Sequence, residues 1–159
     1  MQQRLSSPPG DIKPVYDVVV VGSGYGGGVA ASRLARARQS VCVIEKGKEF
    51  PIGSFPSRLP ELRRELQLNG GKMRSGSPTG LFDFRLGADI HVLVGCGLGG
   101  GSLINAGVAL EPDARVFADS VWPEEVAGYG LLALGFERAA SMLRPSRYAG
   151  APGLTKYRA

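Results

Sequence analysis

The sequence predicts an α/β fold that is built on a strand–helix–strand unit near the N-terminus. Residues 16–21 end in four consecutive valines, and such a run is typical of a strand buried on both faces of a parallel sheet. Apolar residues recur at helical spacing over residues 25–37, and residues 41–44 are a second short apolar run. A strand, a helix and a strand within about thirty residues make a βαβ unit, whose crossover is expected to be right-handed.

The middle of the chain is expected to hold a long connection and then a β-hairpin. Leucines over residues 59–68 predict a weak amphipathic helix. Residues 69–80 are rich in Gly and Ser and predict a long, mobile connection. Residues 81–85 alternate between apolar and polar, and residues 90–94 are mostly apolar. These two segments are expected to pair as a hairpin whose loop is longer than the two-residue type.

Helices are expected in the last third of the chain. Pro112 and the following Asp predict a short helix that continues to Phe117. Trp122 precedes a proline that breaks the pattern, and it is interpreted as a packing anchor. The periodicity of residues 131–143 predicts a helix, which Pro145 ends.

Composition excludes several classes of protein. The chain has 159 residues, 43% of them hydrophobic, and its 24 glycines follow no collagen-like period. No apolar run is long enough to span a membrane, and no signal peptide is seen, so a cytoplasmic location is the default expectation. Two cysteines and one histidine exclude a disulfide framework and argue against a metal site. The net charge of +5 is scattered without interleaved aromatic residues, so nucleic acid is not an expected partner.

A first glycine cluster follows the first predicted strand and precedes the first predicted helix. It fits the pattern G-x-G-x-x-G at Gly22, Gly24 and Gly27. In that context the first glycine permits a tight turn, the second a close approach to a pyrophosphate, and the third close packing of helix and strand. Tyr25 and Gly26 stand at the helix N-terminus, where free N–H groups attract phosphate, and they complete the predicted binding turn.

An acidic residue stands where a ribose would be bound. Glu45 ends the second predicted strand, 18 residues after Gly27, since 45 − 27 = 18. A carboxylate there accepts hydrogen bonds from a ribose diol and repels a 2′-phosphate, so NADP is disfavoured. This first cluster does not separate NAD from FAD. Arg38 and Gln39 occupy the end of the helix, where a glycine is usual, which weakens the cap without touching the ligand.

A second glycine cluster separates the two cofactors. Residues 95–112 read GCGLGGGSLINAGVALEP, which resembles the N-terminal signature of the glucose–methanol–choline (GMC) flavoprotein oxidoreductases, and more closely their cholesterol-oxidase-like branch. The resemblance extends over residues 16–148. It implies FAD as the cofactor and an incomplete Rossmann-type FAD-binding domain with a small hairpin and helical segments. The residues that the resemblance places near the flavin and the pyrophosphate are Gly100, Gly101, Asn105, Ala106 and Val108.

The resemblance also implies what the chain lacks. Some family members attach FAD through a histidine just before the Asn, and here that residue is Ile104, so non-covalent binding is expected. The family's catalytic residues are expected downstream of residue 159, so the chain is predicted to be a fragment without turnover. His91 and Cys96 are interpreted as structural. The expected organisation is a flexible tail over 1–14, part of the FAD-binding domain over 15–148 and a truncated tail over 149–159.

Three functions fit these patterns to different extents. The favoured one is the FAD-binding portion of an enzyme that oxidises the CH–OH group of an alcohol or a sterol. A non-catalytic nucleotide-binding remnant or interaction module is an alternative that keeps the βαβ unit. An NAD-dependent dehydrogenase agrees with Glu45 but leaves the second glycine cluster unexplained. The sequence does not indicate an oligomeric state.

Overall fold

A computed structural model describes residues 4–128 and 130–147. The chain divides into two compact units, Met1–Gly107 and Val108–Ala159, and each is described here by itself. The predicted tail over 149–159 lies outside the described residues, and the predicted boundaries at 14 and 148 stay predictions.

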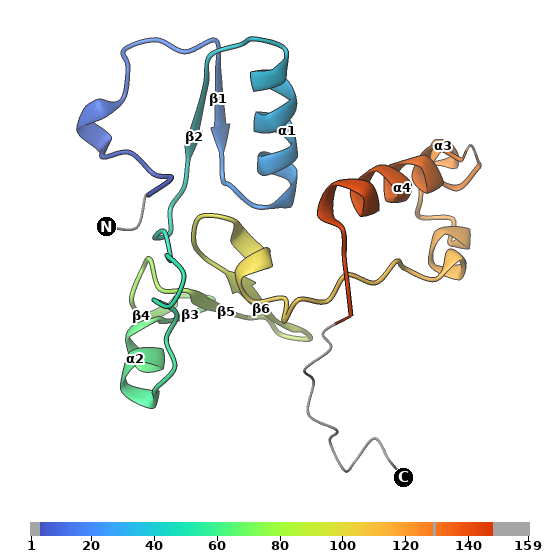
Figure 1. Ribbon diagram of the computed structural model, residues 1–159. Helices are drawn as coiled ribbons and strands as arrows, with labels where there is room; N and C mark the ends of the chain where they lie inside the picture. The colour runs from blue at the N-terminus through green and yellow to red at the C-terminus, as the bar shows by residue number, and fades with distance from the viewer. Residues whose placement is uncertain (1–3, 129, 148–159) are drawn as a thin grey trace. The chain divides into compact units, whose positions relative to one another are not determined.

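The first unit begins with the expected βαβ arrangement. Strand β1 (Val18–Val21), helix α1 (Tyr25–Arg36) and strand β2 (Val41–Ile44) follow one another in the chain. The two strands are parallel and pair residue for residue from Val18 opposite Val41 to Val21 opposite Ile44. Helix α1 runs antiparallel to them and lies alongside both (Figure 1). The predicted strand–helix–strand unit is therefore confirmed, with β1 starting two residues later than expected.

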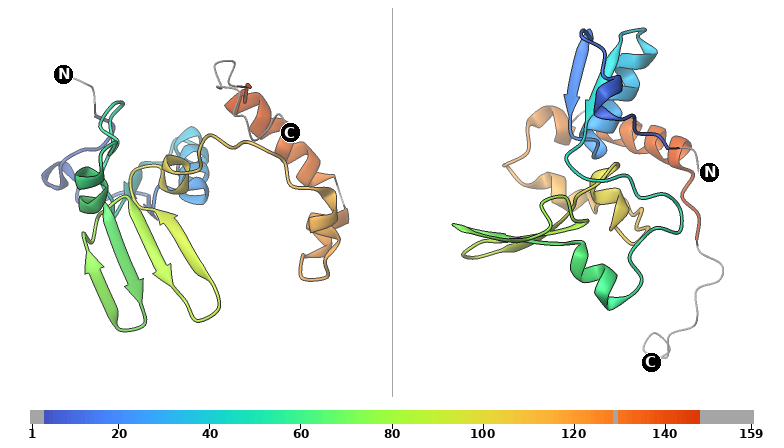
Figure 2. Two further views of the ribbon diagram at one scale, coloured as in Figure 1. Left: turned by 90° about the horizontal axis from the view of Figure 1, so that it is seen from below. Right: turned by 90° about the vertical axis from the view of Figure 1, so that its left-hand side faces the viewer.

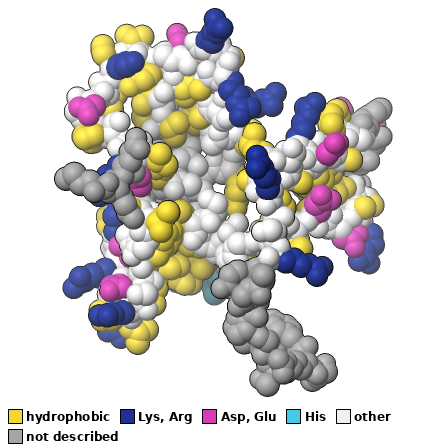
Figure 3. All heavy atoms as spheres, in the orientation of Figure 1, with side chains coloured by type: hydrophobic (Ala, Val, Ile, Leu, Met, Phe, Trp, Pro, Cys, Tyr) yellow, Lys and Arg dark blue, Asp and Glu magenta, His cyan; other side chains and the backbone are white. Residues whose placement is uncertain are grey.

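The prediction that the first strand is buried on both faces is wrong for this structure. Burial alternates along β1, and the side chains of Val19 and Val21 are 53% and 84% exposed. The described sheet has two strands and one covering helix, so one face of β1 has no layer above it. Hydrophobic side chains are accordingly visible on the surface around β1, β2 and α1 (Figure 3).

The first unit also contains a four-stranded mixed sheet, which follows helix α2 (Leu59–Arg64) in the chain. Its strands are β3 (Leu66–Gly70), β4 (Met73–Gly76), β5 (Phe82–Leu86) and β6 (His91–Gly95). The strand order is β4-β3-β5-β6, and the left view of Figure 2 shows the four strands side by side. Strands β5 and β6 pair antiparallel, which confirms the predicted hairpin, whereas β3 and β5 pair parallel.

Two predictions for the segment before this hairpin are wrong. Residues 69–80 are not a long connection, because β3 turns through Gly71 and Lys72 into β4 as an antiparallel hairpin. The helix predicted over 59–68 ends at Arg64, and Leu66 begins a strand instead. The reason is tertiary: Leu66 pairs with Phe82 of β5, a partner that local periodicity cannot indicate.

The most buried side chains of the described residues lie at one end of this sheet. Leu81 is 1% exposed, and the N–H group of Cys96 donates to the Leu81 carbonyl at 2.8 Å. Gln67 and Asp83 are also buried, and both are hydrogen-bonded. Cys96 is a buried free thiol, as expected for a space-filling residue.

The second unit contains η3 (Ala114–Ala118), α3 (Glu124–Gly128) and α4 (Leu131–Leu143). The bounds of α4 match the predicted helix, and Asp113 caps η3 by accepting from the N–H of Arg115. The ring of Trp122 lies 5.4 Å from that of Phe117, which agrees with its interpretation as a packing anchor. Helix α3 was not predicted from the sequence.

The N-terminal segment contacts the rest of the first unit. The N–H groups of Leu5 and Ser6 and the Ser6 hydroxyl all donate to the carboxylate of Glu49. A short 3₁₀ helix, η1 (Pro9–Asp11), follows. Within the described ranges, no helix combines the length and the apolar character that crossing a membrane requires.

Candidate functional site

The glycines of the first cluster shape the turn between β1 and α1. Gly22 has φ +90°, in the left-handed region that favours glycine, and its N–H group donates to the Ile44 carbonyl at 2.8 Å. A Cβ atom on Gly27 would overlap the carbonyl oxygen of Gly22, so the third glycine lets the helix approach the end of the strand. Gly24 is the N-cap of α1.

The N-terminus of α1 offers hydrogen-bond donors without a protein partner. Within the described residues, the N–H groups of residues 24–27 form no hydrogen bond, and the first turn carries no acidic side chain. A Cβ atom on Gly24 or on Gly26 would have nothing within 4 Å, so both residues have open space on their Cβ side. Free amides, the positive end of a twelve-residue helix and open space fit the pyrophosphate of a dinucleotide.

Glu45 lies beside this turn at the end of β2. Its Oε2 accepts from the N–H and the hydroxyl of Ser23 at 2.9 and 2.7 Å, and its Oε1 accepts from the N–H of Gly47 at 2.8 Å. Partial burial alone would raise the pKa of Glu45, but these hydrogen bonds outweigh it and lower the pKa below its ordinary value. Glu45 is therefore an ionised acceptor, and three of its roughly four acceptor sites are used by these hydrogen bonds, which leaves about one for a ribose hydroxyl.

Ser23 connects the two glycine clusters. Besides donating to Glu45, its hydroxyl oxygen accepts from the N–H of Gly99 at 2.9 Å. Sequence reasoning missed this residue because it occupies an unspecified position of G-x-G-x-x-G. The available signal was a small hydroxyl side chain inside a turn that has an acidic neighbour in space.

Two glycines of the second cluster make room for neighbouring backbone. A Cβ atom on Gly100, which starts the 3₁₀ helix η2 (Gly100–Leu103), would lie 2.7 Å from the Cα of Gly24. A Cβ atom on Gly97 would lie 2.9 Å from the carbonyl oxygen of Lys48. Gly101, whose nearest such contact is the Tyr25 ring at 3.8 Å, and Gly107, which has nothing within 4 Å, are left open. Close packing against the first cluster thus accounts for Gly100, and close packing against the segment after β2 accounts for Gly97. The sequence interpretation did not assign these roles.

Asn105 meets the first cluster through Tyr25. Its Nδ2 donates to the Tyr25 hydroxyl at 2.8 Å, and its Oδ1 accepts from the N–H of Gly107 at 3.0 Å. Ala106, between them, has φ +55°. The structure therefore brings together Tyr25, Asn105 and Ala106 of the predicted site, whereas Val108 begins the second unit and its part in the site stays a prediction.

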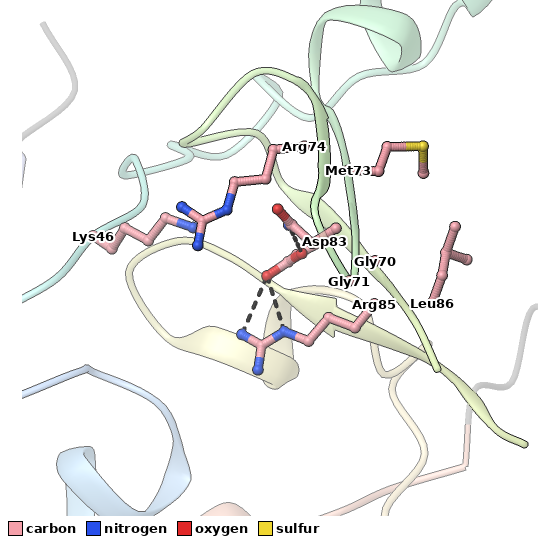
Figure 4. Close-up of a pocket in the computed structure, with 9 residues that line it drawn as sticks. Lys46, Gly70, Gly71, Met73, Arg74, Asp83, Arg85 and Leu86 are labelled. Carbon is pink, nitrogen blue, oxygen red and sulfur yellow. Dashed lines mark hydrogen bonds and ion pairs between the residues drawn. The ribbon is translucent and has the colours of Figure 1, made fainter. Parts of the chain in front are cut away.

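A cavity also lies elsewhere in the first unit. It has a volume of about 400 Å³, and it lies against β3, β4 and β5. Lys46, Arg74 and Arg85 extend toward it, and Arg85 is paired with the buried Asp83 at 3.2 Å (Figure 4). Lys46 donates to Gln67 at 3.0 Å. None of the predicted FAD-binding residues lines this cavity.

Comparisons with known proteins agree with this geometry. Residues 17–57, which contain the βαβ unit and Glu45, match the family model "FAD binding domain". Over 132 residues the chain is 34% identical to a cholesterol oxidase of Mycobacterium tuberculosis, a match that covers 83% of this chain and 22% of that protein. The chain is homologous to the GMC-type FAD oxidoreductases. An uncharacterized GMC-type oxidoreductase of M. tuberculosis is 35% identical over 72% of this chain, and it is covered to 16%.

A third GMC homologue comes from a plant. The long-chain-alcohol oxidase FAO3 of Arabidopsis thaliana is 39% identical over 69% of this chain and is covered to 13%. The chain thus spans about a fifth or less of the length of the GMC-type relatives it matches. The Rossmann-type α/β fold, the family resemblance and FAD as the cofactor are confirmed.

Proposed function

We propose that the chain binds FAD non-covalently as part of a GMC-type oxidoreductase that oxidises the hydroxyl group of an alcohol or a sterol. The carrying observation is the N-terminus of α1, whose amides have no protein partner among the described residues and whose Gly24 and Gly26 are open on the Cβ side, near the ionised Glu45. The printed names of the relatives, cholesterol oxidase and long-chain-alcohol oxidase, support this class of substrate.

Each part of the site has a role in this proposal. The amides of residues 24–27 hold the pyrophosphate, and Glu45 accepts hydrogen bonds from the ribose. Gly101 and the turn formed by Asn105 and Ala106 lie toward the flavin. FAD, when bound, supplies the acceptor for a hydride from the substrate carbon at flavin N5. The chain's own contribution is binding and orientation.

We further propose that this chain has no turnover by itself and no covalent flavin link. Its single histidine, His91, lies exposed at the start of β6 and is not one of the predicted cofactor-binding residues. Ile104 stands where covalent members of the family carry a histidine, and isoleucine has no nucleophilic atom.

Equilibrium dialysis of the purified chain against FAD and against NAD tests the proposal. The expected result is saturable binding of FAD, weaker binding of NAD and complete release of the flavin on acid denaturation. The absence of FAD binding would overturn the proposed function, and flavin retained by the denatured protein would overturn the non-covalent part alone. Peroxide formed from an added alcohol or sterol would contradict the absence of turnover.

A further inference from the structure

One side chain joins the phosphate-binding turn to the segment that is expected beside the flavin. Tyr25 is the first residue of α1, and Asn105 follows η2, 80 positions later in the chain. The Asn105 Nδ2 donates to the Tyr25 hydroxyl oxygen at 2.8 Å. Among the described residues, no other side chain–side chain hydrogen bond connects α1 with residues 100–107.

The other end of the same amide stabilises an unusual turn. The N–H group of Gly107 donates to the Asn105 Oδ1 at 3.0 Å, and the two residues after Asn105, Ala106 and Gly107, have φ values of +55° and +70°. Left-handed backbone is unfavourable for alanine because of its Cβ atom. The turn therefore depends on Asn105, and the orientation of Asn105 depends in turn on Tyr25.

We propose that Tyr25 is a positioning residue for the flavin. It acts by holding the Asn105 turn in a fixed position relative to the amides at the start of α1. This inference rests on the proposed FAD binding. One cofactor molecule must meet both segments at once, so a link between them lowers the free-energy cost of ordering the site on binding.

The surroundings of Tyr25 argue that its hydroxyl is not required for folding. The Tyr25 side chain is 61% exposed, and Asn105 is exposed as well. Loss of an exposed hydrogen bond leaves both groups free to bind water, so it costs the fold little. The geometry thus separates an effect on the cofactor from an effect on stability.

The variant Tyr25→Phe removes the hydroxyl group and keeps the ring. We expect the FAD dissociation constant to rise about three- to tenfold, as for one hydrogen bond. The visible spectrum of the bound flavin and its midpoint potential should shift as well, because its surroundings change. The melting temperature of the cofactor-free chain should stay unchanged. Tyr16→Phe is the matched control, because it removes a phenolic oxygen that accepts from the Lys13 N–H group at 3.2 Å, outside both glycine clusters.

A double-mutant cycle tests whether Tyr25 acts through Asn105. In an Asn105→Ala background, Tyr25→Phe should change neither the dissociation constant nor the spectrum further. An equal effect of Tyr25→Phe in both backgrounds, or an unchanged dissociation constant and spectrum in the single variant, would overturn this inference while the proposed function stands. A wild-type chain that binds no FAD would overturn the proposed function itself, and with it this inference.

Discussion

A negative charge at position 26 should affect folding and FAD binding in opposite directions. Gly26 is the second residue of α1, and a Cβ atom there meets nothing within 4 Å, so Gly26→Asp fits without displacing any neighbour. An acidic side chain in the first turn interacts favourably with the helix dipole, and replacing glycine in a helix is itself favourable. The variant should therefore stabilise the cofactor-free chain by about 0.5–1.5 kcal/mol.

The same carboxylate should oppose the pyrophosphate of FAD. One charge facing two at about 5 Å costs roughly 2 kcal/mol at the dielectric constant of water and roughly 7 kcal/mol at an effective value of 20. Because every 1.4 kcal/mol is a factor of ten, the FAD dissociation constant should rise at least about 20-fold. Gly26→Ala adds the methyl group without the charge and is the matched control, with a much smaller effect on binding.

Two measurements read out the opposite effects. Thermal unfolding of the cofactor-free variant should show a melting temperature raised by about 1–5 °C, and FAD titration should show the weakened binding. If Gly26→Asp bound FAD as tightly as the wild-type chain, the pyrophosphate would not lie at the N-terminus of α1. A lowered melting temperature would refute the reasoning about the helix dipole.

Three further predictions concern the neighbourhood of this turn. Ser23→Ala leaves the Gly99 N–H without its acceptor and removes one donor to Glu45. Urea unfolding should therefore show a free energy of unfolding lowered by about 1–3 kcal/mol, and FAD titration should show weaker binding. An unchanged urea midpoint would contradict the bridging role of Ser23. The pKa of Glu45 is lower in the folded chain than in the unfolded chain. The ionised side chain therefore adds to the free energy of unfolding above the ordinary carboxyl range, roughly pH 4–5, and this contribution is lost as the pH falls through the folded pKa. The free energies of unfolding of the wild-type chain and of Glu45→Gln, measured in urea, should therefore converge as the pH is lowered. A difference between the two that stays constant with pH would contradict this prediction. Arg38 has φ +64°, so Arg38→Gly should raise the unfolding free energy by about 0.5–1 kcal/mol without changing FAD affinity, whereas a lower melting temperature would show that the arginine side chain matters more than the backbone.

Elements with strong local patterns could be predicted from the sequence. The βαβ unit follows from the valine run, the glycine turn and the helical periodicity, and α4 follows from its periodicity and the proline beyond it. The β5–β6 hairpin follows from an alternating segment and a mostly apolar segment on the two sides of a turn. In each case the residues that decide the element are close together in the chain.

Elements that depend on distant partners could not be predicted. Strand β3 exists because Leu66 pairs with Phe82, and the hairpin partner β4 then forms next to it. Within the site, the glycine spacing and Glu45 were readable, because they belong to one local unit. The bridge through Ser23 to Gly99 was not readable, because it joins residues 76 positions apart.

The central claim is that the amides at the start of α1 bind the pyrophosphate of FAD, and nuclear magnetic resonance of the ¹⁵N-labelled chain tests it most directly. On addition of FAD, the backbone amide signals of Gly24, Gly26 and Gly27 should shift together, because hydrogen bonds to phosphate change their surroundings. Riboflavin, which carries no phosphate, should leave these three signals in place. FAD binding that leaves the same signals unmoved would contradict the account.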